Sequence, residues 1–150
     1  MRCRSAGVYI RIVDTHGDSP CIQIAGALVG AWIAHAMFEL DIFQVSQTAR
    51  TGAGQWLAES VATFGLVGTI LVVVHHRAEA VPYAVGLFIT AGYWFTASTS
   101  FANPAVTVAR GFTDTFSGIQ PGHIAGFVGA QMLGAVLATY LYRWLLDTSE

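Results

Sequence analysis

The chain has 150 residues, of which 54% are hydrophobic and 11% are charged, with a formal net charge of −2. An ordinary soluble domain has about 25% charged residues, so the composition favours a single-domain membrane protein. The high apolar content excludes a disordered chain. All seven basic residues are Arg and form no basic patch, which argues against a nucleic-acid partner. Two cysteines, Cys3 and Cys21, are too few for a disulfide scaffold.

Long stretches without charge predict four membrane-spanning helices. Three stretches contain no Asp, Glu, Lys or Arg: residues 20–38, 80–109 and 115–142. Because a spanning helix needs about 20 mostly apolar residues, we predict spans at residues 21–40, 55–75, 81–97 and 122–144. The alternative is four buried helices of a soluble protein, which is disfavoured because such helices show a polar face.

The distribution of Arg predicts the orientation of these spans. With four spans, both termini share one side of the membrane, and positive charge is enriched on the cytoplasmic side. One side carries five Arg and the other carries two: Arg2, Arg4, Arg11, Arg77 and Arg143 against Arg50 and Arg110. We therefore expect a multi-pass protein of the cell (inner) membrane with both termini in the cytoplasm. The first 20 residues lack the apolar core of a signal peptide.

Small residues repeat every four positions in two of the predicted spans. The first span contains Gly26 and Gly30, and the last contains Gly126, Ala130 and Gly134. Membrane helices associate through close backbone approach at small residues, so both sets are predicted to pack against neighbouring helices. The alternative is that Gly is simply frequent in membrane helices.

A short helix is predicted to begin at Pro104. Asn103 is a favoured N-cap, because its side-chain oxygen accepts a backbone N–H, and Pro suits the first helical position. Gly111 and the polar residues 113–121 end the helix. About ten residues span about 15 Å, which is half of a hydrocarbon core of about 30 Å.

A half-length helix between full spans predicts a re-entrant segment. Non-helical backbone is tolerated at membrane depth only inside protein or beside a water-filled cavity. We therefore expect the backbone of Thr99, Ser100, Phe101 and Ala102 to line a pore. The helix dipole repels cations near the midplane, while the Asn103 amide donates to a neutral oxygen. The segment thus predicts a pore for small neutral solutes; the alternative is a surface loop followed by a capped surface helix.

Glu59 is the only charge between residues 51 and 76. An ionisable group inside a span usually faces the protein interior and has partners. The exposed N–H groups of re-entrant backbone suit a carboxylate, so Glu59 is expected to brace the loop before Asn103. Glu59 lies only four or five residues into its predicted span, so the alternative is a carboxylate that reaches interfacial water.

A short internal repeat and the half-helix motif together resemble a known family. Gln23-Ile-Ala-Gly-Ala27 is similar to Gln131-Met-Leu-Gly-Ala135, and inverted repeats occur in membrane transport folds. With Asn103-Pro104-Ala105, Glu59 and the run from Gly86 to Gly92, the pattern resembles the major intrinsic proteins, the aquaporins and aquaglyceroporins. The residues from Tyr93 to Val106 are most similar to the bacterial branch associated with arsenic-resistance genes.

The resemblance implies an all-α membrane protein, a partial aquaporin-like bundle of four transmembrane helices and one re-entrant half-helix. Residues 21–146 would form the channel domain, with the third to sixth spans and the second half-helix of the family. Residues 1–20 resemble nothing in the family, and residues 147–150 form a tail. The implied function is passive transport of water, glycerol or undissociated arsenous acid, without cofactor or catalysis, by a homotetramer if the channel is complete.

Two departures from the family pattern shape these expectations. Family members carry two Asn-Pro-Ala motifs and this chain carries one, so a truncated, non-conducting remnant is the alternative to a channel. Most members place Arg directly after the second motif, where this chain has Val106, and Arg110 follows one turn later. This predicts a wider, less polar constriction that favours solutes larger than water. Tyr93 falls near another filter position of the family.

The remaining polar residues are weaker candidates. The histidines lie on different predicted spans or at their ends, so we expect no metal site; they include His35, His75, His76 and His123. Cys3 and Cys21 could bind trivalent arsenic as a pair, although two ordinary cysteines are the simpler interpretation. A membrane enzyme is a third hypothesis, but no phosphate-binding loop or Ser/His/Asp spacing supports it.

Overall fold

The computed structural model describes residues 20–147, and the regular elements in this range are all helical. In chain order they are α2 (Pro20–Met37), α3 (Ala53–Arg77), the 3₁₀ turn η1 (Ala78–Ala80), α4 (Val81–Phe95), α5 (Pro104–Arg110), η2 (Pro121–His123) and α6 (Ile124–Asp147). The predicted N-terminal segment, with Cys3, and most of the predicted tail fall outside the described residues. The all-helical architecture confirms the predicted fold class.

Each predicted span coincides with a helix, and the bounds differ by at most three residues. The first helix ends early, at Met37, because the chain turns at Glu39, whose φ of 56° is left-handed. The 25 residues of α3 and the 24 of α6 extend over about 37 and 36 Å, enough to cross a hydrocarbon core.

The other two spans are shorter than predicted. The 18 residues of α2 and the 15 of α4 extend over about 27 and 22 Å. By length and hydropathy, two segments of the described chain are long enough to cross a membrane, Ala53–Phe95 and Pro121–Leu146, and Cys21–Met37 is a shorter apolar helix. The longer of these segments contains both α3 and α4.

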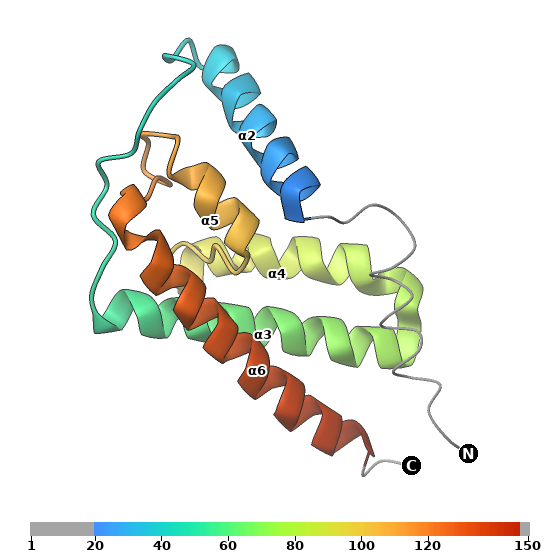
Figure 1. Cartoon of the computed structure of the whole chain (residues 1–150). Helices are drawn as coiled ribbons and strands as arrows, with labels where there is room; N and C mark the ends of the chain where they lie inside the picture. Colours follow the sequence, from blue (N-terminus) through green and yellow to red (C-terminus); the bar gives the residue numbers. More distant parts are fainter. Residues whose placement is uncertain (1–19, 148–150) are drawn as a thin grey trace.

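The helices form a bundle in which α6 contacts both α3 and the short helix α5 (Figure 1). Helices α3 and α4 lie antiparallel, joined by η1, and α6 crosses α3 in the most extensive contact of the bundle. Helix α2 packs against the short helix α5, which in turn contacts α6. The half-helix is therefore held between the first and last helices of the described chain.

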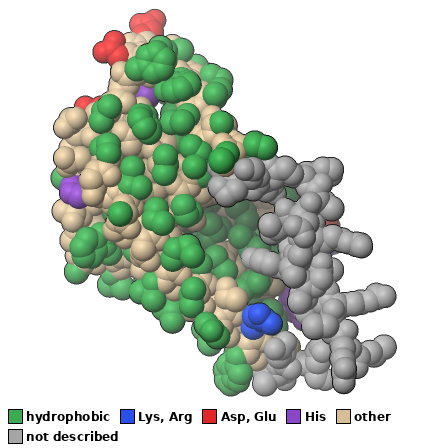
Figure 2. Space-filling model, in the orientation of Figure 1, with side chains coloured by type: hydrophobic (Ala, Val, Ile, Leu, Met, Phe, Trp, Pro, Cys, Tyr) green, Lys and Arg blue, Asp and Glu red, His purple; other side chains and the backbone are tan. Residues whose placement is uncertain are grey.

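The outer surface of the bundle is strongly apolar. Figure 2 shows hydrophobic side chains over most of the visible face, with acidic side chains gathered at the end where α2 gives way to a loop. Large side chains such as Leu87, Tyr83 and Trp94 are 73 to 88% exposed. Only 22 and 28% of the residues in the two apolar windows are buried. Exposed apolar area on this scale argues against four core helices of a soluble protein and fits a lipid environment.

Candidate pore site

The half-helix begins where the sequence predicts. Asn103 has extended backbone angles, and its side-chain oxygen accepts the Ala105 N–H at 2.8 Å. The Asn103 carbonyl accepts both the N–H and the hydroxyl of Thr107 at 2.9 Å. The helix ends at Arg110, followed by Gly111. Its seven residues extend over about 10 Å, which is shorter than expected.

The loop before Asn103 has an unusual backbone. Thr99, Ser100 and Ala102 have φ values of 61°, 49° and 47°. Residues with a Cβ adopt this left-handed region at a cost of about 1–2 kcal/mol each. Such a conformation persists only where surrounding contacts hold it in place. Two buried charged side chains, Glu59 and Arg50, provide contacts of this kind.

Glu59 is fully buried, and its carboxylate faces the loop. One oxygen accepts the N–H of Phe101 at 3.3 Å, and the other accepts the N–H of Ala102. The second oxygen also accepts the Gln131 side-chain amide at 2.9 Å. A buried carboxylate needs such donors to offset its lost hydration. The alternative of a carboxylate in interfacial water does not match this position.

Gln131 extends this network to the half-helix. It is 2% exposed, and its amide nitrogen also donates to the Thr107 hydroxyl at 2.8 Å. Helix α6 is thus linked to α3 through Glu59 and to α5 through Thr107. From the sequence alone, Gln131 stands out only as part of the repeat. The available signal was an amide in the middle of an apolar span, which is costly unless it is bonded.

Arg50, from the loop between α2 and α3, is a second residue whose contribution the sequence alone does not reveal. It is 7% exposed, and each guanidinium nitrogen donates to a backbone carbonyl. The acceptors are Gly118 at 2.7 Å, Ser98 at 3.2 Å and Phe116 at 2.6 Å. One side chain therefore joins three loops. Nothing local in the sequence distinguishes it from an ordinary loop Arg.

Arg110 and Tyr93 meet above the same loop. Arg110 donates to the Tyr93 hydroxyl and, at 3.4 Å, to the Thr99 hydroxyl. Its guanidinium carbon lies 4.2 Å from the ring centroid of Phe101, and that ring packs 5.2 Å from the ring of Phe127. The geometry is a cation–π contact.

The predicted pore residues divide into an accessible and a buried group. Tyr93, Thr99, Asn103, Val106 and Arg110 are partly exposed and Pro104 is exposed, whereas Ser100, Phe101, Ala102 and Ala105 are buried. Asn103, Val106 and Arg110 follow at spacings of three and four, which places them on one helix face. The accessible group offers amide, hydroxyl and guanidinium donors beside one apolar side chain.

The predicted packing residues also divide into two sets. On α6, a Cβ at Gly134 would collide with the backbone of Ser60, and one at Gly126 would lie 2.7 Å from the Trp56 ring nitrogen. Ala130 is 8% exposed, and its carbonyl accepts the Ser60 hydroxyl at 3.0 Å. This half of the predicted seam packs closely against α3.

The structure does not bring Gly26 or Gly30 of α2 against another described helix. A Cβ at either position meets nothing within 4 Å. The reason is rotational: the more buried side of α2 carries Ile24, Leu28 and His35, and at 100° per residue the two glycines fall on the opposite side. The expected seam on this helix is therefore absent within the described chain.

The histidines occupy separate places. His35 bridges the end of α2 to the segment after α5, with Nδ1 2.9 Å from the Ile42 carbonyl and Nε2 2.8 Å from the Thr113 hydroxyl. His123 accepts the Arg50 N–H. Across residues 20–147, no group of three His, Cys, Asp or Glu side chains lies close enough to hold a metal ion.

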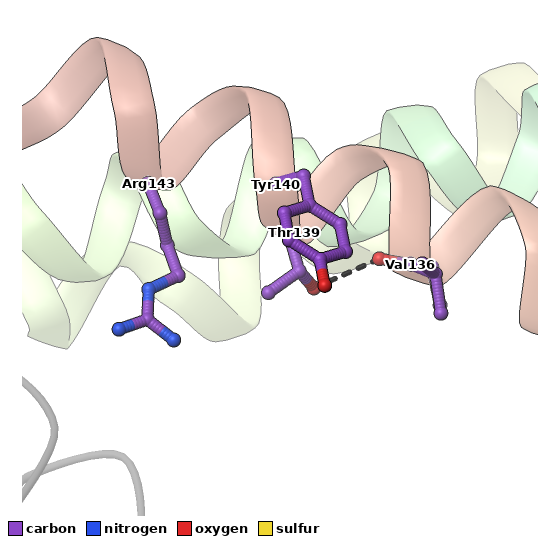
Figure 3. Close-up of a pocket in the computed structure, with 5 residues that line it drawn as sticks. Val136, Thr139, Tyr140 and Arg143 are labelled. Atoms are coloured by element: carbon purple, nitrogen blue, oxygen red, sulfur yellow. Dashed lines mark hydrogen bonds between the residues drawn. The ribbon is translucent and has the colours of Figure 1, made fainter.

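Two surface hollows lie away from the half-helix. One, of about 400 Å³, is open and lined by α6 residues that include Thr139, Tyr140 and Arg143. Figure 3 shows these side chains extending from α6 without converging. The other, of about 680 Å³, is an apolar groove along the α3–α6 crossing. Neither groups polar side chains around a common point.

Comparison with known proteins identifies one relative of high similarity. The protein "Aquaglyceroporin AqpS" of Rhizobium meliloti (strain 1021) is 61% identical over 128 residues. The match covers 85% of this chain and 55% of the relative, so the chain spans about half of that protein's length. No protein-family model and no solved structure matches. On the strength of this identity and the all-helical apolar fold, the matched part of this chain belongs to the major intrinsic protein family, as a multi-pass membrane protein.

Proposed function

We propose that this chain is a passive transmembrane facilitator for small neutral solutes. The observation that carries the proposal is the half-helix headed by Asn103, with its partly exposed face and its buried support from Glu59 and Gln131. Since Ala105 occupies the Asn103 side-chain oxygen, the amide nitrogen is the group of Asn103 that can donate to a passing solute.

Selectivity follows from the charges along this face. The N-terminal end of a helix carries partial positive charge, which disfavours protons and other cations. Solute oxygens accept hydrogen bonds from Asn103 and Arg110 as they pass. No bond is made or broken, and solutes move down their own gradient. No residue of this face requires a cofactor.

The solutes are proposed from the shape of the same face. Val106 stands one turn from Asn103 and adds an apolar surface instead of a further cation. This arrangement suits compact solutes that carry both hydroxyl groups and carbon or a weakly polar atom. Glycerol and undissociated arsenous acid fit this description, and water, which is smaller, passes as well. The relative's name, an aquaglyceroporin, supports glycerol.

The proposal extends to location and assembly. We place the protein in the cell (inner) membrane with both termini in the cytoplasm, because the Arg residues divide five to two between the sides. We also propose a homotetramer for a complete channel, as the family resemblance implies.

A second candidate is a non-conducting membrane protein that retains the same helix packing. Its support is that Pro104, at the head of the half-helix, is exposed, and that a Cβ at Gly26 or Gly30 of α2 would meet no atom of the described residues. The described helices α2 and α6 hold the half-helix but leave this end of it uncovered. Such a protein would insert stably into lipid and leave solute permeability unchanged.

Solute-driven swelling of proteoliposomes separates the two candidates. The chain is reconstituted, and light scattering is followed after a glycerol gradient is applied. A facilitator swells the vesicles several-fold faster than protein-free vesicles do. Asn103→Asp is the matched variant, because Asp caps the helix equally well but has no amide donor and carries a negative charge. We expect it to lose glycerol flux. Equal rates for loaded and empty vesicles would reject the channel and support the second candidate.

A further inference from the structure

Two guanidinium groups share one aromatic ring beside the half-helix. The guanidinium carbon of Arg110 lies 4.2 Å from the Phe101 ring centroid, and that of Arg50 lies 5.3 Å from it. Arg50 reaches the ring from the loop between α2 and α3, and Arg110 reaches it from the last residue of α5. The charge of Arg110 acts on Arg50, and like charges repel each other in a protein interior.

The two side chains are held very differently. Arg50 is 7% exposed and fixed by bonds to the carbonyls of Ser98, Phe116 and Gly118. Arg110 is partly exposed, and within residues 20–147 its side chain bonds to two hydroxyl groups, those of Tyr93 and Thr99, and to no backbone carbonyl. The repulsion therefore acts mainly on Arg110. It favours the position of Arg110 on the Tyr93 side, away from the fixed charge.

One carboxylate, that of Glu59, acts electrostatically on both guanidinium groups but is not paired with either. In the part of the chain that the structure describes, neither Arg50 nor Arg110 forms an ion pair, and Glu59 directs its oxygens to Phe101, Ala102 and Gln131. Burial, and then the charge of Arg110, lowers the pKa of Arg50 below its ordinary value. Arg nevertheless keeps its proton at neutral pH, so two positive charges face one negative charge.

We propose that Arg50 and Arg110 form a paired guanidinium filter at the pore site. Arg110 is the group that contacts the solute, and Arg50 is a positioning residue that orients Arg110 and adds to the positive field. The inference rests on the proposed function and deepens it. Val106, directly after the Asn-Pro-Ala motif, carries no charge. The positive charge comes instead from Arg110, one helical turn later, and from Arg50 in the loop between α2 and α3.

The filter selects by chemistry as well as by size. Arg has five N–H donors, and among the described residues the Arg110 side chain donates two hydrogen bonds, both to hydroxyl groups. Three N–H donors are then left for solute oxygens. Neutral solutes with several oxygens are therefore favoured, and cations are excluded by the paired charge. A free oxyanion is expected to bind at Arg110 and to obstruct passage.

Cation leak in proteoliposomes tests the role of Arg50. Arg50→Met removes the charge and keeps a side chain of similar length. Arg50→Lys keeps the charge but lacks the three guanidinium nitrogens that bond the three carbonyls. Arg77→Met is the control, because Arg77 is exposed. We expect the ratio of potassium leak to glycerol flux to rise about tenfold in Arg50→Met, because one unit of buried charge is lost. In Arg50→Lys the ratio stays near that of the wild type.

The Lys variant separates charge from scaffolding. A single ammonium group cannot replace a fork that bonds three carbonyls, so a purely structural Arg50 would leave Arg50→Lys as impaired as Arg50→Met. That result would overturn the proposal. A wild-type ratio in Arg50→Met would overturn it as well.

Sulfate binding provides a readout that does not depend on flux. Inorganic sulfate is titrated against the detergent-solubilised protein at constant ionic strength, and the unfolding midpoint is recorded. We expect sulfate to raise the midpoint of the wild type and of Arg50→Lys, but not of Arg110→Met. If the wild type shows the sulfate effect without glycerol flux, the channel function fails while the paired site stands. If the wild type conducts glycerol without any sulfate effect, the paired site fails alone.

Discussion

Helices α2 and α6 carry the same short sequence pattern, Gln-x-x-Gly, in opposite surroundings. On α6, Gln131 is 2% exposed and bonds to Glu59 and Thr107, and the Gly134 backbone lies against Ser60. On α2, Gln23 is exposed and Gly26 faces open space. The pattern specifies a helix that can accept a close neighbour through a flat, small-residue face. Whether that face is buried depends on residues elsewhere in the chain.

The contrast teaches what the repeated glycines contribute. In α6, Gly134 lets the backbones of α6 and α3 approach more closely than any residue with a Cβ would allow. Gln131 then forms hydrogen bonds across this contact, to Glu59 and to Thr107, which hold the half-helix in place. In α2, the same residues contribute nothing to packing among the described residues. Substitutions of small and amide residues on the two helices should therefore have unequal effects, and three pairs test this in descending order, two of them at matched positions of the repeat.

The largest effect is expected at Gly134. In Gly134→Ala the new methyl group meets the carbonyl of Ser60 and the backbone nitrogen of Phe64, and neither can move without displacing α3. Overpacking of this kind costs about 3 kcal/mol. The matched variant Gly26→Ala meets no atom and should be neutral or slightly stabilising, because Ala favours a helix. Reversible unfolding in mixed detergent micelles measures both, and equal losses would contradict the comparison.

A smaller effect is expected at the two glutamines. Gln131→Ala removes the donor shared by Glu59 and Thr107 and leaves a buried carboxylate oxygen with one partner fewer. The loss of such bonds costs about 2 kcal/mol. Glycerol flux, where it is measurable, should fall together with stability because Thr107 belongs to the first turn of α5.

Gln23→Ala is the control for this pair. Its side chain is exposed, so we expect the free energy of unfolding to change by less than about 0.5 kcal/mol. A large loss in Gln23→Ala would mean that α2 has a partner in the membrane that the described residues do not provide.

Local rules explain which features the sequence could predict. The N-cap preference of Asn and the position of Pro104 located the start of α5 to the residue, because both act within one helical turn. Glu59 stood out because a charge in an apolar segment is rare and needs a partner. The lengths of α2 and α4 were overestimated because apolar loops and apolar helices look alike by composition.

Non-local contacts explain what the sequence could not predict. Arg50 lies 48 positions from Ser98 and 68 from Gly118, and no local sequence pattern predicts hydrogen bonds between residues so far apart in the chain. Gln131 meets Glu59 across 72 positions. The glycine repeats of α2 and α6 are similar in composition and spacing, so a difference in packing between them can only come from the arrangement of the whole bundle.

The smallest effect is expected at Gly126. A Cβ there lies 2.7 Å from the ring nitrogen of Trp56, but Trp56 is 42% exposed and its side chain can rotate outward. The remaining strain is about 1 kcal/mol, and the helix preference of Ala offsets much of it. Gly126→Ala and its control Gly30→Ala, at a glycine of α2 that meets no atom within 4 Å, should therefore differ by less than about 1 kcal/mol in the same unfolding assay. Tryptophan fluorescence reports the accompanying movement of Trp56, which Gly30→Ala should not produce. If Gly126→Ala were as damaging as Gly134→Ala, side-chain contacts at this crossing would be as rigid as backbone contacts, and the ranking of these positions would lose its physical basis.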